Sequence, residues 1–216
     1  MELSELRRLV NSGEGTHIEF KKKVADPLKI TKEVVAFANA TGGYLIVGVS
    51  DDGKIDGVRE PEGELYILEE EIRKRCKPSV HYTVHKVPLN RNIHVLVLEI
   101  KESTQKPVFL AYNLKTGRGK AYIRVADKSV QMSKVVRNIL KESRRELIQG
   151  FSYGVNEQWV LRYLDEHERV TLKEFSEKAK ISQEDAEAVL VSLTVSNVLE
   201  VLPSEVQDIF RLKPNA

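Results

Sequence analysis

A short apolar segment between two turns most constrains how this chain can fold. Tyr44 to Val49 is continuously apolar, follows Gly42-Gly43 and precedes Asp51-Asp52-Gly53. A strand with apolar side chains on both faces has to be covered on both sides. We therefore expect this segment to be the central strand of a sheet, buried on both of its faces.

Helices and strands alternate before and after this strand. The apolar spacing predicts helices near residues 3–11, 27–39, 62–76 and 133–149, and strands near 17–23, 55–58, 80–87, 93–100, 108–112 and 121–125. Asp26-Pro27 supplies a cap and a first-turn proline for the second helix. This order predicts an α/β (α+β) domain with a mixed sheet.

The last part of the chain has a different pattern. Gly150 to Gly154 is typical of a linker. Beyond it, helices are expected at about 156–166, 171–178 and 182–197, followed by short strands at 198–202 and 208–212, which is the order of a winged helix. We expect two domains, residues 1–148 and a small winged-helix-like domain at residues 155–214.

Composition narrows the class of protein. Hydrophobic residues make up 41% of the chain and charged residues 31%, which is typical of a soluble globular protein. No apolar run approaches a membrane span, and the first residues look like an amphipathic helix, so we expect a cytoplasmic protein. Cys76 is the only cysteine, which excludes an intrachain disulfide and zinc sites built on cysteine pairs.

The charge is unevenly distributed. Residues 1–150 contain 27 Lys and Arg against 20 Asp and Glu, whereas residues 151–216 contain 7 against 12. A basic surface attracts phosphate backbones and an acidic one repels them. We expect any nucleic-acid surface on the first part, although ordinary solvated surface explains the same numbers.

Several short motifs occur in a specific order. They are Glu14, Glu19-Phe20-Lys21, Ala36 to Asn39 with Gly42-Gly43, Gly48 to Asp51, and Tyr122 to Val125. Together they resemble the Schlafen AlbA-like domain over roughly residues 5–145. One departure is that Ala40-Thr41-Gly42-Gly43 lacks the usual spacer between the threonine and the glycines, or has it shifted by one position. The resemblance implies nucleic-acid binding, and many prokaryotic proteins with this domain are regarded as transcriptional regulators.

The resemblance also implies a candidate catalytic site. Some Schlafens are metal-dependent endoribonucleases with three carboxylates, which here would be Glu14, Glu19 and Asp51, with Asp52 as the alternative third member. Such carboxylates hold Mg²⁺ or Mn²⁺ through hard oxygen ligands. The alternative for each residue is structural: Glu14 caps a turn, Glu19 pairs with Lys21 or Lys23, and Asp51-Asp52-Gly53 is an ordinary turn. We expect no other cofactor.

Basic residues near these motifs are candidates for phosphate contact, with Tyr122 nearby for base stacking. The set is Lys21, Lys23, Lys115, Arg118, Lys120 and Arg124. A solvated hairpin tip is the alternative for those at 115–120. An ATP site is not expected, because Ile55 stands where the G-x-x-x-x-G-K motif of Gly48, Gly53 and Lys54 requires Ser or Thr.

The helix expected at 182–197 argues against DNA reading by the C-terminal domain. It begins with Glu184, Asp185 and Glu187 and contains no Lys or Arg. We expect a protein-contact or dimerisation role there, and a homodimer formed through this acidic tail or through the apolar stripe of the helix at 133–149.

The charge distribution and the resemblance together predict a nucleic-acid-binding protein, and the resemblance implies a DNA-binding transcriptional regulator. The alternative is a metal-dependent endoribonuclease that cuts structured RNA, and a third possibility is a pure protein-interaction module.

Overall fold

The computed structural model describes residues 1–144 and 153–214 of the chain. It divides into two compact units, Met1–Val130 and Gln131–Ala216. This division falls earlier than the boundary near residue 148 that the sequence suggested. The reason is helix α4 (Lys134–Glu142), whose Val135 and Ile139 belong to the apolar core of the second unit. The part of the predicted helix beyond residue 144 lies outside the described residues.

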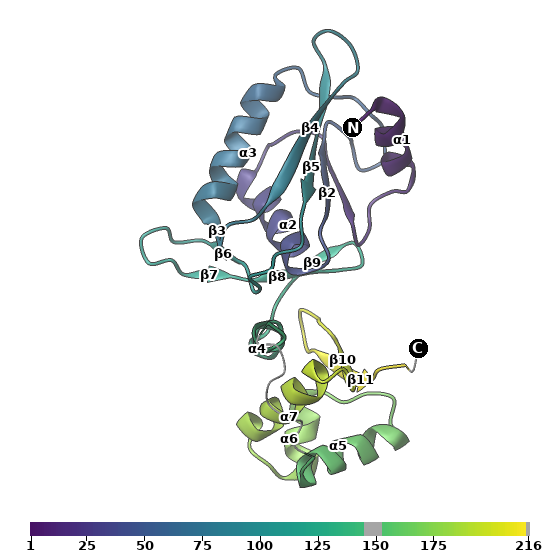
Figure 1. The fold of residues 1–216 in the computed structure, drawn as a ribbon, viewed down its shortest axis with the longest axis vertical. Helices are drawn as coiled ribbons and strands as arrows, with labels where there is room; N and C mark the ends of the chain where they lie inside the picture. The colour runs from purple at the N-terminus through teal and green to yellow at the C-terminus, as the bar shows by residue number, and fades with distance from the viewer. Residues whose placement is uncertain (145–152, 215–216) are drawn as a thin grey trace. The chain divides into compact units, whose positions relative to one another are not determined.

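The first unit contains a four-stranded mixed sheet in the order β1-β2-β5-β4 (Figure 1). The strands are β1 (Ile18–Lys21), β2 (Gly43–Val47), β4 (Tyr82–Pro88) and β5 (His94–Ile100). Strand β1 is parallel to β2, whereas β5 is antiparallel to both β2 and β4. The predicted mixed sheet is confirmed.

Strand β2 is buried on both faces, as its sequence predicted. Leu45 and Val47 pack on one face with helices α2 (Pro27–Asn39) and α3 (Pro61–Arg75). Ile46 packs on the other face with helix α1 (Leu3–Asn11). Figure 1 shows α2 and α3 on one side of the sheet and α1 on the other. The sheet is therefore the middle layer of this unit.

Helix α2 begins and ends where its sequence predicts. The Asp26 side chain accepts a hydrogen bond from the backbone N–H of Lys29 at 3.1 Å, and Pro27 occupies the first turn. The helix ends before Gly42, whose φ of +81° places it in the left-handed region. A Cβ at this position would lie 2.6 Å from the carbonyl oxygen of Ile100. Glycine is therefore required for both conformation and space.

The other strands of this unit pack near the end of α2. Strands β3 (Cys76–Lys77), β6 (Phe109–Ala111) and β7 (Gly119–Lys120) form one small sheet, and β8 (Tyr122–Val125) pairs with β9 (Lys128–Gln131). The side chain of Asn39, fully buried, donates to the carbonyls of Val108 and Tyr122, each at 2.8 Å. The segment at 55–58 forms isolated bridges instead of the predicted strand.

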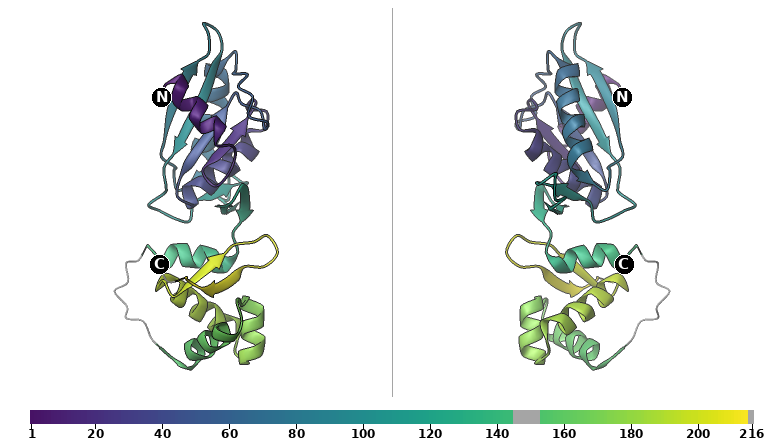
Figure 2. Two further views of the ribbon diagram at one scale, coloured as in Figure 1. Left: turned by 90° about the vertical axis from the view of Figure 1, so that its right-hand side faces the viewer. Right: turned by 90° about the vertical axis from the view of Figure 1, so that its left-hand side faces the viewer.

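In its described residues, the second unit contains α4, three further helices and a β-hairpin (Figure 2). The helices are α5 (Val155–Glu166), α6 (Leu172–Ala179) and α7 (Gln183–Val195), and the hairpin pairs β10 (Leu199–Leu202) with β11 (Ile209–Leu212). Its core includes the fully buried Val160, Phe175, Leu190 and Phe210. The helices and the hairpin follow the order expected from the sequence. No helix in the described ranges is long and apolar enough to cross a membrane.

Candidate nucleic-acid interface

Strand β1 lies at one edge of the main sheet, so half of its backbone polar groups point away from β2. The carbonyls of His17 and Lys21 accept hydrogen bonds from Tyr44 and Gly48, both at 2.7 Å. The backbone groups of the intervening Ile18 and Phe20 therefore face outward from the sheet. Several residues of the predicted site lie at this edge.

Glu14 binds the outward N–H of Phe20, which donates to its Oε1 at 2.8 Å. Burial raises the pKa of Glu14, the bond from Phe20 opposes that effect, and the charges of Glu19 and Asp51 raise the pKa further. The three carboxylates implied by the resemblance are thus electrostatic neighbours. The contact to Phe20 also makes Glu14 a cap of the strand edge.

Arg124 reaches the same edge from β8. Its Nη2 donates to the Glu19 carboxylate at 2.8 Å and to the Ile18 carbonyl at 3.4 Å, and its Nη1 donates to the Glu33 carboxylate at 2.9 Å. The guanidinium also lies 4.9 Å from the centre of the Phe37 ring. One arginine thus connects β8, β1 and α2.

This environment corrects the expectation that Arg124 contacts a phosphate. The side chain is 1% exposed, and both of its carboxylate partners are themselves largely buried. It has no free surface for a ligand, and we remove it from the candidate interface.

The carboxylates in this arrangement do not fit a metal site. Glu19 is bound by Arg124 and also by the Lys21 ammonium, and Glu14 is bound by the Phe20 amide. Within residues 1–144 and 153–214, no group of three His, Cys, Asp or Glu side chains is arranged to hold a metal ion. Charge neutralisation by the two cations leaves Glu19 little capacity to bind a third.

The two aspartates after β2 differ in their contacts. The Asp52 carboxylate accepts hydrogen bonds from the Ser50 hydroxyl at 2.5 Å and the Lys54 amide at 3.3 Å, which lower its pKa. Asp52 therefore organises the turn, as the structural alternative proposed. Asp51 is exposed, close enough to Glu14 to influence its pKa.

The predicted basic residues fall into two groups with different surroundings. Lys21 is held by Glu19 and by the Phe20 carbonyl at 2.7 Å, whereas Lys23 is exposed. Lys115, Arg118 and Lys120 are also exposed, on the hairpin that joins β6 to β7. In the described part of the chain, no acidic side chain forms a salt bridge with these three cations or with Lys23.

The β6–β7 hairpin combines these cations with exposed apolar groups. Residues 103–126 contain no Asp or Glu, so the hairpin and its flanks carry only positive charge. Tyr112 is 44% exposed and Leu114 is 53% exposed. Unpaired cations beside an exposed aromatic ring are the chemistry that binds phosphates and stacks on bases.

The aromatic residue available for stacking is Tyr112, whereas the sequence suggested Tyr122. Tyr122 is buried, its ring lies 5.8 Å from the Lys32 ammonium, and burial raises its pKa. Its hydroxyl is hydrogen-bonded to that of Tyr112 at 2.6 Å. The position of each tyrosine in the sequence could have distinguished them. Tyr112 directly precedes the glycine-rich loop, where side chains are exposed, whereas Tyr122 follows the loop inside a strand of alternating pattern.

The charge difference between the two units is smaller than the sequence boundary suggested. Residues 1–130 contain 22 Lys and Arg against 18 Asp and Glu, and residues 131–216 contain 12 against 14. The cations of α4 belong to the second unit, which accounts for the change. The local charge of the β6–β7 hairpin is therefore a stronger indication of a nucleic-acid surface than the net charge of either unit.

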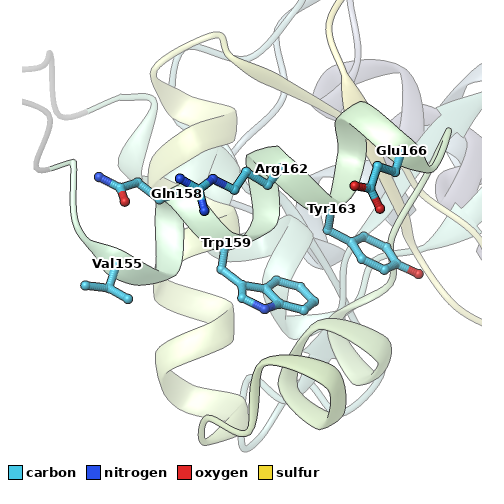
Figure 3. A pocket seen from close by; sticks show the side chains of 6 residues that line it. All are labelled: Val155, Gln158, Trp159, Arg162, Tyr163 and Glu166. Atoms are coloured by element: carbon cyan, nitrogen blue, oxygen red, sulfur yellow. The ribbon is translucent and has the colours of Figure 1, made fainter.

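A second candidate surface lies along α5 in the C-terminal unit (Figure 3). A hollow of about 400 Å³ is lined by Val155, Gln158, Trp159, Arg162, Tyr163 and Glu166. The rings of Trp159 and Tyr163 are stacked with their centres 5.2 Å apart, and Figure 3 shows them extending to the same side of the helix. Val155 at the start of the helix is 82% exposed. This face offers apolar and aromatic groups for contact with a protein.

Comparisons with known proteins identify the first unit. A family model described as "Schlafen, AlbA_2" matches residues 14–133, which is more than half of the chain. Among solved structures, the chain is similar to the crystal structure of the DIP2311 protein from Corynebacterium diphtheriae, with 17% sequence identity and a TM-score of 0.47. That alignment covers 85% of this chain and 40% of the other, so the chain spans about two fifths of the length of that protein.

Proposed function

Because the chain belongs to the Schlafen AlbA_2 family, for which nucleic-acid binding is the expected activity, we propose that it is a nucleic-acid-binding protein that acts as a DNA-binding transcriptional regulator. In this proposal the first unit binds the nucleic acid through the β6–β7 hairpin, and the C-terminal unit contacts protein.

The observation that carries the proposal is the charge of the hairpin. Lys115, Arg118 and Lys120 are exposed, and no acidic residue occurs between residues 103 and 126. Each such cation that contacts a phosphate releases counterions from the duplex, which is the main source of sequence-independent affinity. Tyr112 and Leu114 add an aromatic and an apolar contact at the same place.

The C-terminal unit is proposed to be a winged-helix-like module that does not read DNA. Three helices followed by a β10–β11 hairpin support the first part, as does the bridge between Val170 and Phe210, which places a short segment beside the hairpin. In this proposal helix α7 is the counterpart of a recognition helix, but α4 packs against it. Glu187 of α7 accepts hydrogen bonds from Lys134 at 3.1 Å and Asn138 at 2.6 Å.

The exposed end of α7 also disfavours DNA contact. Ala186, Leu190 and Leu193 are buried, while Glu184 and Asp185 are exposed at its first turn. These acids repel a phosphate backbone. The α5 hollow with Trp159 and Tyr163 is instead the proposed protein-contact surface of this unit.

A metal-dependent endoribonuclease is the second candidate function. It is supported by the electrostatic proximity of Glu19 and Asp51 to Glu14: burial is the main cause of the raised pKa of Glu14, and the two neighbouring charges add to it. Its weakness is that Glu19 is bound by Arg124 and Lys21. We therefore derive no catalytic step from these carboxylates.

The binding proposal is tested by replacing Lys115, Arg118 and Lys120 with Ala in the full chain. Binding of labelled duplex DNA and labelled structured RNA is measured by fluorescence anisotropy over a range of salt concentrations. Each lost phosphate contact reduces the slope of log affinity against log salt by about 0.9, so the three together reduce it by up to about 2.7.

The matched control replaces Arg7, Arg8 and Arg91, which are exposed cations of the same unit, with Ala. This control removes the same net charge and is expected to leave the slope nearly unchanged. Equal slopes for the hairpin variant and the wild-type protein exclude the hairpin from the interface. RNA cleavage by the wild-type protein in Mn²⁺, abolished by Glu19→Gln, establishes the nuclease instead.

A further inference from the structure

The two edges of the main sheet differ in how their outward backbone groups are bound. At the β1 edge, Glu14 accepts from the Phe20 amide, Lys21 donates to the Phe20 carbonyl, and Arg124 donates to the Ile18 carbonyl. These side chains close that edge against another strand. Strand β4 forms the opposite edge.

The outward positions of β4 follow from its pairing with β5. Lys101 donates to the His81 carbonyl and Leu89 donates to the Ile93 carbonyl, both at 2.9 Å. In an antiparallel pair, alternate residues exchange both backbone bonds. The odd-numbered residues of β4 therefore face β5, and Tyr82, Val84 and Lys86 direct their N–H and C=O groups outward.

Among the described residues, no side chain binds the outward backbone groups of β4 as side chains do at the β1 edge. Across residues 1–144 and 153–214, no hydrogen bond outside the sheet reaches the backbone of Tyr82, Val84 or Lys86. An edge strand with unbound backbone groups is a template for pairing with another strand. Pro88 has no N–H and ends this template at the C-terminal side.

Helix α3 runs beside this edge and gives it a polar pattern. The Tyr82 hydroxyl donates to Glu69 at 3.4 Å, and the Lys86 ammonium donates to Glu62 at 2.6 Å. A hollow of about 440 Å³ between α3 and the start of β4 is lined in part by Tyr66, Ile72 and Val80. Tyr66 is 68% exposed. The edge thus has an acidic, aromatic end at Tyr82, and its other end carries the Lys86 cation, which Glu62 of the same chain binds.

We propose that β4 pairs antiparallel with β4 of a second copy of this chain, across a two-fold axis at Val84. In this register Tyr82 lies opposite the partner's Lys86, and each of the three outward residues exchanges two backbone hydrogen bonds with the residue opposite. The two four-stranded sheets then form one continuous sheet. The contact is isologous, as a closed dimer requires.

Charge complementarity supports a second copy as the occupant. Side chains opposite each other in a sheet point to the same face, so the partner's Lys86 lies beside Tyr82 and the Glu69 carboxylate. The symmetry repeats the pair at the other end. The apolar stripe that the sequence offered for a dimer is used elsewhere, because Val135 and Ile139 of α4 are buried in the C-terminal core.

The test is the mass in solution, measured by light scattering and sedimentation over the micromolar range without nucleic acid. The wild-type protein is expected to have twice the 24.6 kDa mass of the chain. Lys86→Glu places two carboxylates together, and Glu69→Lys places two ammonium groups together, so each single variant is expected to be monomeric. The double variant Lys86→Glu with Glu69→Lys restores the pair with its charges exchanged and is expected to regain the dimer mass.

Two further variants complete the design. Val84→Pro removes an outward N–H that β5 does not use, and it is expected to abolish the dimer; circular dichroism checks its folding. Lys128→Glu, at an exposed position on β9, makes the same charge change elsewhere and is expected to leave the dimer intact.

A monomeric wild-type protein overturns the proposal, as does a dimer that both single charge variants leave unchanged. A double variant that stays monomeric while each single variant is folded also overturns it. None of these results depends on nucleic-acid binding, so the outcome is separate from that of the proposed function.

Discussion

Replacing Arg124 with methionine is expected to destabilise the first unit strongly. Its guanidinium is the shared partner of the Glu19 and Glu33 carboxylates, and its side chain is 1% exposed. Methionine keeps most of the apolar stem but removes every hydrogen bond and the charge. Two carboxylates are then left in a poorly solvated environment.

The contacts that remain set the magnitude. Removing one partner of a buried ion pair costs about 3–5 kcal/mol. Glu19 keeps Lys21, and Glu33 keeps the Ser129 hydroxyl and Lys32, so we expect the lower end, about 3 kcal/mol. With a urea dependence of about 1.5–2 kcal/mol per molar, the midpoint of the first unit falls by about 1.5–2 M.

Urea unfolding of the full chain separates the two units. The only tryptophan is Trp159, in the second unit, so its fluorescence follows that unit. Far-ultraviolet circular dichroism follows both, and the difference between the two signals reports the first unit. The fluorescence transition is expected to stay in place in the variant.

Two comparisons make the result specific. Arg118→Met removes an exposed arginine and is expected to change stability by less than about 0.5 kcal/mol. Adding Glu33→Gln to Arg124→Met removes one uncompensated charge and is expected to recover part of the loss. A loss below about 1 kcal/mol for Arg124→Met refutes a structural role for this arginine and reopens its assignment to the nucleic-acid interface.

Two other predictions follow from single positions. Burial raises the pKa of Glu14 in the folded state, so ionisation of this carboxyl opposes folding as pH rises through that pKa. The Glu14→Gln variant keeps an acceptor for the Phe20 amide but carries no charge. It is therefore expected to stabilise the first unit at neutral pH, and to give no stabilisation below pH 4.5, the ordinary pKa of glutamate. Urea unfolding at the two pH values measures this, and an equal effect at both contradicts it. Gly42→Ala forces a strained φ and a contact with the Ile100 carbonyl, so the free energy of unfolding is expected to fall by about 2 kcal/mol or more. Gly63 lies in helix α3 with open space around it, so Gly63→Ala is expected to raise the free energy of unfolding by up to about 1 kcal/mol. Thermal unfolding followed by circular dichroism compares them, and a shift of the same sign in both argues against backbone strain at Gly42.

Local pattern was sufficient for most of the secondary structure. The predicted helix at 27–39 agrees with α2 because its cap, its first-turn proline and the glycines after it all lie within a few residues of its ends. The central position of β2 was predicted because a strand that is apolar on both faces has no other stable location. The segment at 55–58 was predicted to be a strand but forms isolated bridges, because bridges and short strands have the same local sequence.

The domain boundary required tertiary structure. The apolar stripe of α4 predicts that one face is buried, but periodicity does not say against which core. Val135 and Ile139 pack with the second unit, so the boundary moves to residue 130.

The candidate site was likewise predicted in part from local sequence and in part decided by the tertiary structure. Short motifs identified Glu14 and Glu19, and β1, which follows Glu14, pairs in parallel with β2, so that the charges of Glu19 and Asp51 both act on Glu14. Glu19 pairs with Lys21, two residues away, as the structural alternative proposed, but its other partner, Arg124, lies 105 residues away in the chain, and no local pattern connects the two. A charged side chain is recognisable from its sequence, but whether it binds a ligand or a neighbour depends on its burial and on the charges that the fold places beside it.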